Sequence, residues 1–175
     1  MGVIKGIEHI GITVPAIEEA ERFFQAAFGA RTLYALIEKG GKSQHGEDMH
    51  HKNGLEPGTT IVAMRMMRLG EGANVELFEV DGGHGSTPHG PSRMGLHHFA
   101  LYVDDLDAAA ARFRAAGGTM REGPIDLGGK ERGAGNRAWF GLTPWGLQVE
   151  FIHLPSPLAL DDPQHSGPRW MPQEA

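Results

Sequence analysis

Glu8–Val14 reads EHIGITV, and His97–Val103, 89 positions further along the chain, reads HHFALYV. In both stretches a histidine precedes alternating apolar residues, which is the pattern of a strand with one buried face. The same offset continues beyond them and pairs residues of the same kind: Ile17 with Leu106, Phe24 with Phe113, Ala27 with Ala116, and Gly29 with Gly118. The chain therefore contains an internal repeat, in which one structural unit occurs twice.

Each copy predicts a strand, a helix and three further strands. Apolar residues recur at helical spacing from Ile17 to Ala27 and from Leu106 to Ala116, and glycines follow both segments. The later strands are expected at Arg31–Ile37, Thr60–Arg68 and Asn74–Val80 in the first copy, and at Met120 with its neighbours, Arg137–Leu142 and Leu147–Leu154 in the second. The order βαβββ, present twice, predicts an α+β fold of two tandem modules.

The amino-acid composition indicates where the two modules begin and end and what the other segments are. We place the first module at residues 1–81 and the second at 94–154, with a linker at 82–93 that is rich in Gly, Pro and His. The first copy is the longer one, and its extra residues fall at about 38–58, where we expect an inserted loop between strands. Residues 155–175 are rich in proline and are expected to form an extended C-terminal tail.

The composition of the 175 residues excludes several classes of partner. No apolar run approaches the ~20 residues of a membrane-spanning helix, and the first residues lack the pattern of a signal peptide. We therefore expect a cytoplasmic location and no membrane partner. A net charge of −6 without a Lys/Arg cluster argues against nucleic acid. Because the chain has no cysteine, any metal must have nitrogen and oxygen ligands.

Strand parity places one histidine and one glutamate of each copy on equivalent faces. In each of their strands the apolar residues alternate with the candidate and are expected to face the helices, so the candidate points away from them. The four candidates are His9, Glu76, His98 and Glu150. A sheet whose second face curls around a cavity would bring them together.

Parity also separates these candidates from their neighbours. His97 falls on the expected helix-facing side of its strand, and Glu79 shares the face of Val75 and Leu77. His98 and Glu76 are therefore the better candidates for ligands.

Two imidazoles and two carboxylates are a suitable donor set for a divalent metal. We therefore predict one divalent metal per site, either zinc, nickel, cobalt, manganese or iron, with water completing the coordination. The alternative is that the histidines and glutamates satisfy one another inside a polar core.

At these residues the chain resembles the vicinal oxygen chelate superfamily, the group of glyoxalase I, bleomycin-resistance proteins and extradiol dioxygenases. The resemblance covers residues from about 4 to 154, and it rests on four motifs: IEHIGI at 7–12, VEL at 75–77, GLHHFAL at 95–101, and TPWG at 143–146 leading into Glu150. It implies that the mixed sheets of two βαβββ modules form a curved cup around a metal site. The set of four ligands looks most like those of glyoxalase I and methylmalonyl-CoA epimerase.

The resemblance implies a divalent-metal-dependent lyase or isomerase of the glyoxalase I or methylmalonyl-CoA epimerase type. Its substrate would be a small-molecule carbonyl or thioester, from which Glu150 or Glu76 removes a proton to give an enediolate or enolate. Two alternatives stay open. One is an iron-dependent ring-cleaving dioxygenase, which in this group uses three ligands, and the other is a non-catalytic small-molecule-binding protein of the resistance type.

Strand parity alone adds Tyr102, Arg137 and Trp139 as residues that line the cavity and contact the substrate. Related proteins are often dimers, so we expect a homodimer. The four ligands would then meet either within one chain or across the dimer. Thr143 and Trp145 stand where glyoxalases commonly have acidic residues, so the resemblance does not identify the substrate.

Overall fold

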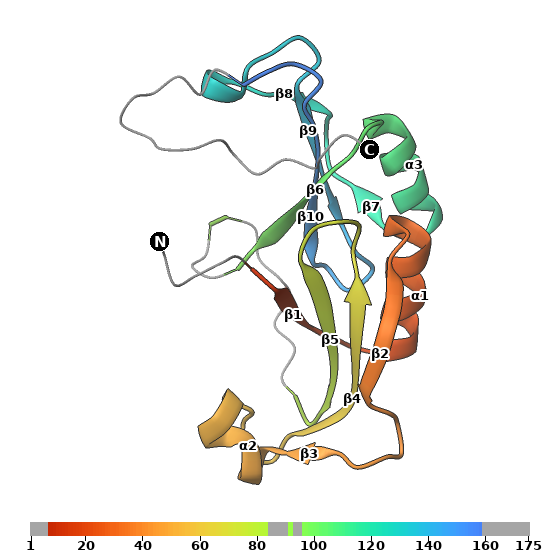
Figure 1. Ribbon diagram of the computed structural model, residues 1–175, viewed down its shortest axis with the longest axis vertical. Coiled ribbons are helices and arrows are strands. Elements are labelled where there is room, and N and C mark those ends of the chain that lie inside the picture. The colour runs from red at the N-terminus through yellow and green to blue at the C-terminus, as the bar shows by residue number, and fades with distance from the viewer. Residues whose placement is uncertain (1–6, 84–90, 93–95, 159–175) are drawn as a thin grey trace. The chain divides into compact units, whose positions relative to one another are not determined.

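The computed structural model describes residues 7–83, 91–92 and 96–158 of the chain (Figure 1). It divides into two units, Met1–Ser86 and Thr87–Ala175. Most of the predicted linker at 82–93 and most of the predicted tail at 155–175 lie outside the described residues.

The first unit has the order βαβββ, with an addition before its third main strand. Its elements are β1 (His9–Val14), α1 (Ile17–Phe28), β2 (Arg31–Ile37), β3 (Gln44–His45), α2 (Gly46–Asn53), β4 (Thr60–Arg68) and β5 (Asn74–Asp81). The main strands form a mixed sheet in the order β1-β5-β4-β2, in which β1 and β5 are parallel and the other neighbours antiparallel. The short strand β3 pairs with β4.

The second unit repeats this arrangement. Its elements are β6 (His98–Tyr102), α3 (Leu106–Ala115), β7 (Thr119–Met120), β8 (Ile125–Asp126), a 3-10 turn η1 (Gly129–Glu131), β9 (Arg137–Leu142) and β10 (Gln148–His153). The strand order is β6-β10-β9-β7, with β6 and β10 parallel and β8 paired with β9. Both units therefore have the same order and strand directions, which confirms the predicted α+β fold of two βαβββ modules.

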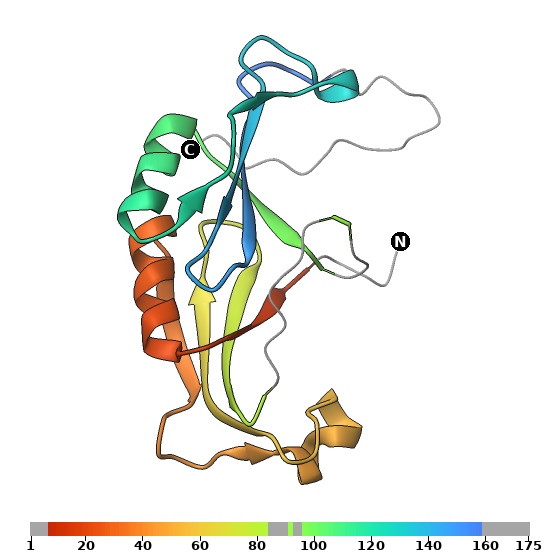
Figure 2. The same ribbon diagram turned by 180° about the vertical axis from the view of Figure 1, so that it is seen from behind.

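One helix covers one face of each sheet (Figures 1 and 2). The apolar side of α1 is buried, and α3 packs on its own sheet, where the rings of Phe113 and Phe151 meet edge to face at 5.2 Å. Phe24 and Phe113, which the repeat offset pairs, are both completely buried. Each core therefore lies between a helix and the facing side of its sheet. Among the helices that the structure describes, none is long and apolar enough to cross a membrane.

The helix ends show how the sequence limits each helix. Gly29 ends α1 in the left-handed conformation, with φ 67°, and its amide donates to the Gln25 carbonyl, as predicted for a C-terminal glycine. Asp105 caps α3 by accepting a hydrogen bond from the Ala108 amide at 2.9 Å. Pro15 precedes α1, and no side chain of the adjoining segment caps that helix. Its cap comes from β5, where Glu79 accepts a hydrogen bond from the Ile17 amide at 2.7 Å.

We expect Glu79→Ala to lower the free energy of unfolding by about 1–2 kcal/mol, the usual cost of losing a helix N-cap. Lys39 Nζ lies between two carboxylates, 2.9 Å from Glu79 and 2.8 Å from Glu18. Lys39→Ala is therefore a matched control, because it removes the exposed ion pairs and leaves the Glu79 carboxylate at the cap. Urea unfolding measures both losses, and equal losses in the two variants would contradict the capping role.

The segment at 38–58 differs from the prediction of an inserted loop, because it contains β3 and the helix α2. The sequence of α2, GEDMHHKN, has Met49 as its single large apolar residue, so it has no apolar periodicity from which a helix could be predicted. A Cβ atom on Gly46 would lie 1.9 Å from the Glu56 carbonyl oxygen, and glycine permits this close approach. After the helix, Leu55 packs against a buried cluster of Ile37, Ile61 and Met64.

Candidate functional site

The parallel strands β1 and β5 bring the first histidine and glutamate together. Their register places Glu76 beside Gly11, and His9 precedes Gly11 by two residues, so His9 and Glu76 share one face of the sheet. His9 Nε2 and Glu76 Oε2 are 3.5 Å apart. The alternate residues of β5, Val75 and Leu77, are buried on the other face. His9 and Glu76 therefore lie on the same face of the sheet, opposite Val75 and Leu77, as strand parity predicted.

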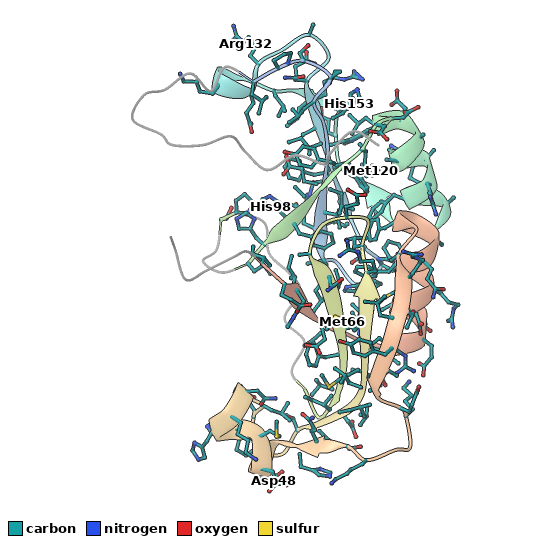
Figure 3. The ribbon with its side chains drawn as sticks, viewed as in Figure 1. Asp48, Met66, His98, Met120, Arg132 and His153 are labelled. Atoms are coloured by element: carbon teal, nitrogen blue, oxygen red, sulfur yellow. The ribbon has the colours of Figure 1, made fainter. Side chains whose placement is uncertain are left out.

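The second pair is positioned in the same way by β6 and β10. Glu150 lies beside Ala100, and His98, labelled at the start of β6 in Figure 3, precedes Ala100 by two residues. His98 Nε2 and Glu150 Oε2 are 3.3 Å apart. Both units therefore place a histidine and a glutamate at equivalent positions of equivalent strands.

Each unit brings together two of the four predicted ligands. Within residues 7–83, 91–92 and 96–158, no three His, Asp or Glu side chains form a group that could hold a metal. The side chains of Glu76 and Glu150 are mostly buried, at 12% and 16% exposure, whereas that of His9 is 41% exposed. The His9–Glu76 pair is therefore accessible from its imidazole side.

The spacing within both pairs fits two ligands of one ion. The separations of 3.5 and 3.3 Å are longer than the roughly 2.7–3.2 Å of an N–H···O hydrogen bond. Two ligands that each lie about 2.0–2.1 Å from a tetrahedral zinc are roughly 3.3 Å from one another. Imidazole nitrogen and carboxylate oxygen are also donors that divalent transition metals accept. Each pair therefore has the donor types and the spacing of two ligands of a divalent metal.

Glu8 holds the other nitrogen of the first imidazole. His9 Nδ1 lies 2.5 Å from Glu8 Oε2, and this hydrogen bond raises the pKa of His9, to which the nearby charge of Glu76 adds. The same bond lowers the pKa of Glu8, together with a second hydrogen bond from the Asn74 side chain. His9 thus has Nδ1 occupied by a carboxylate and Nε2 directed to Glu76.

The second imidazole has a different neighbour. His98 Nδ1 lies 2.6 Å from His97 Nδ1, and the two ring centroids are 4.6 Å apart. Strand parity predicted that the His97 ring points to the other face of the sheet from the His98 ring. His97 lies one residue before β6 begins, so the alternation of that strand does not apply to it, and its ring lies next to that of His98. His98 nevertheless keeps Nε2 directed to Glu150.

Two apolar residues beside the glutamates were not proposed from the sequence. The antiparallel register places Met66 of β4 (Figure 3) beside Glu76, and Phe140 of β9 beside Glu150. The Phe140 ring meets the His98 ring edge to face, with centroids 5.7 Å apart. Both residues stand ten positions before their glutamate, so alignment of the two copies on the glutamates would have revealed them.

The three predicted substrate contacts divide between the two faces of the second sheet. Tyr102 lies beside Ile152, two residues after Glu150 and on the same face. Trp139 lies beside Phe151 on the opposite face, where the Arg114 guanidinium of α3 stands 4.8 Å from its ring centroid. Arg137 shares that opposite face, beside His153. Of these three residues, only Tyr102 shares the sheet face of Glu150, and Arg137 and Trp139 lie on the opposite face.

The sequence comparisons identify relatives over most of the chain. A family model described as Glyoxalase/Bleomycin resistance protein/Dioxygenase superfamily matches residues 8–140. A curated protein from Actinomyces sp., 2-epi-5-epi-valiolone epimerase, is 34% identical over 160 residues, covering 86% of this chain and 80% of the relative.

Solved structures with low sequence identity share the fold. A glyoxalase family protein from Bacillus cereus has a TM-score of 0.66 at 16% identity, covering 87% of this chain and 97% of that protein. A mutant of the fosfomycin resistance protein FosX from Listeria monocytogenes was solved with Mn(II) and 1S,2S-dihydroxypropylphosphonic acid. It has a TM-score of 0.54 at 16% identity, covering 86% of this chain and 90% of that one.

Proposed function

This chain belongs to the glyoxalase/bleomycin resistance protein/dioxygenase superfamily, and on that premise we propose that it is a divalent-metal-dependent epimerase. It would move a proton on the carbon next to a carbonyl group, by way of an enediolate or enolate. The curated relative with 34% identity is an epimerase, which supports this class over the ring-cleaving dioxygenase and the binding protein.

The observation that carries the proposal is the repeated histidine–glutamate pair at the spacing of metal ligands. We propose that His9, Glu76, His98 and Glu150 bind one divalent ion per site, either zinc, nickel, cobalt or manganese. The two equivalent separations of 3.5 and 3.3 Å support this assignment. The Mn(II) in the FosX structure gives a precedent within the shared fold.

Glu76 and Glu150 are the proton-transfer groups in this proposal. A divalent metal held by these residues would act as a Lewis acid and make the C–H bond beside the substrate carbonyl more acidic. One carboxylate then takes the proton from that carbon, and a proton returns to the same carbon from the other side. An epimerisation needs a proton group for each direction of attack, and Glu76 and Glu150 provide a mostly buried carboxylate in each module.

The neighbours of the glutamates suit this chemistry. Met66 and Phe140 place apolar surface beside the two carboxylates, and this limits the access of water to the proton being transferred. Tyr102, on the face of Glu150, is the residue of the second sheet that we propose as a substrate contact. We propose that the substrate is a small-molecule carbonyl or thioester and that the protein assembles as a homodimer.

Hydrogen exchange with solvent tests the proposed function. We expect the metal-loaded protein, incubated in D2O with 2-epi-5-epi-valiolone, to place deuterium on the carbon beside the carbonyl and to form a second epimer. A coenzyme A thioester and a glutathione adduct of a ketoaldehyde test the other two substrate classes by the same readout. Mass spectrometry and NMR measure both products. Oxygen uptake with a catechol would instead indicate a dioxygenase, and tight binding without exchange would indicate a binding protein.

A further inference from the structure

Glu8 and Asn74 form a brace behind His9 that the proposed mechanism does not use. Asn74 Nδ2 donates a hydrogen bond to Glu8 Oε1 at 2.9 Å, and the other carboxylate oxygen, Oε2, holds His9 Nδ1. The Asn74 backbone amide also donates to the Glu8 carbonyl oxygen at 2.9 Å. Because Asn74 pairs with His9 in the strand register, the three side chains meet at one end of β1 and β5.

The brace restrains a side chain that would otherwise move. The Glu8 side chain is 71% exposed, and an exposed glutamate loses rotamer freedom when it is held in one orientation. Asn74 offsets part of that cost, since it binds the carboxylate oxygen that the imidazole does not use. The Glu8 carboxylate is thereby kept in place at the His9 ring.

We propose that Glu8, held by Asn74, is a positioning residue that fixes the tautomer of His9. An ionised carboxylate can only accept, so in the neutral ring the hydrogen bond places the proton on Nδ1 and leaves the lone pair on Nε2. Nε2 is the atom that faces Glu76, and a nitrogen with a free lone pair is the form of imidazole that binds a metal. This inference rests on the proposed function for its purpose, although the tautomer itself does not depend on a metal.

The second module provides an internal comparison, because it lacks the brace. His97 stands in the place of Glu8, and Gln148 in the place of Asn74. Gln148 Oε1 accepts a hydrogen bond from Arg121 Nε at 2.8 Å, and His98 Nδ1 faces an imidazole, which can donate or accept. The brace is therefore a property of the first module, and removing it should leave the His98 ring unchanged.

Nitrogen-15 NMR of the histidine rings in metal-free protein tests the tautomer. We expect the wild type, at a pH above the titration of the ring, to show His9 with its proton on Nδ1. Glu8→Ala should mix the two tautomers of His9, and Glu8→Gln should restore the wild-type state in part through its amide oxygen. Asn74→Ala should give an intermediate result. This substitution keeps the hydrogen bond from the backbone amide of residue 74 to the Glu8 carbonyl oxygen. It also removes Asn74 Oδ1, a buried acceptor without a hydrogen-bond partner among the described residues.

Glu71→Ala serves as the control, because Glu71 is an exposed carboxylate in the turn between β4 and β5. An unchanged His9 tautomer in Glu8→Ala would overturn the proposal, as would an equal change in Glu71→Ala. A change of the His98 ring as large as that of His9 would also overturn it, because it would indicate a general structural effect.

Cobalt titration of the same variants separates the positioning role from the metal proposal. We expect Glu8→Ala to bind Co²⁺ about 10–100-fold more weakly than the wild type, the usual effect of losing a partner behind a ligand histidine. Wild-type affinity in Glu8→Ala would overturn the positioning role. Failure of the wild-type protein to bind any divalent ion would instead overturn the proposed metal function, and the tautomer result would stand by itself.

Discussion

Removal of divalent metal by a chelator should abolish epimerisation, and one equivalent of zinc, nickel, cobalt or manganese per site should restore it. A Lewis acid beside the carbonyl is worth several kcal/mol of transition-state stabilisation. Its loss therefore corresponds to a rate decrease of roughly a thousandfold or more. Elemental analysis before and after chelation gives the number of metal atoms per chain, and the deuterium exchange rate gives the activity.

Single ligand variants make this expectation specific to the two pairs. His9→Ala and His98→Ala should each lower the metal content and the exchange rate together. His51→Ala is a matched control, because His51 is an exposed imidazole in α2 and belongs to neither pair. A His98→Ala protein that kept a full equivalent of metal and wild-type exchange would remove His98 from the donor set. The same result for both histidines would reject the metal site.

Glu150→Gln and Glu76→Gln should each lower the rate of proton exchange by about 10²–10⁴-fold, the usual contribution of a general base or acid. Glutamine has nearly the shape of glutamate and keeps an oxygen, but it cannot accept the substrate proton. Metal content must be measured on the same samples, so that a lost ligand is distinguished from a lost base. Glu71→Gln, an exposed change of the same kind, provides the control.

The pattern across the two variants assigns the roles. If one variant loses exchange and retains its metal, that carboxylate is the proton acceptor. If both retain the metal and the full wild-type exchange rate, neither glutamate transfers the proton and the proposed mechanism is wrong.

The elements with strong periodicity could be predicted from the sequence. Phe24 and Phe113 recur at the repeat offset because each must fill the same space between a helix and its sheet, and both are completely buried. The helix α2 and the short strand β8 (Ile125–Asp126) could not be predicted, because their sequences show no apolar periodicity. Contacts with distant residues, rather than a local apolar pattern, hold such elements in place.

The candidate site was predictable where parity is unambiguous. Glu76 stands between Val75 and Leu77, so burial of the two apolar side chains decides its face. In β9, by contrast, Trp139 and Phe140 are both large and apolar, and the sequence alone does not say which one faces α3. The pairing of Trp139 with Phe151 decides it, and that register depends on residues of another strand. For the same reason Glu79 was not foreseen as the cap of α1.

β1 pairs with β5 in the same register as β6 pairs with β10. This shared register limits the segments of the chain in which insertions and deletions can be tolerated. A one-residue deletion just before Glu76 would move its carboxylate to the buried face and place a charge in the core. The segment from Glu38 to Thr59 connects β2 to β4, which are neighbouring strands. Ile37, at the end of β2, lies beside Met64 of β4. For the residues of this segment outside β3 and α2, each doubling of length would cost only about 0.6 kcal/mol of closure entropy. Insertions and deletions should therefore accumulate in that segment during evolution, while the strands that carry the two histidine–glutamate pairs keep their lengths.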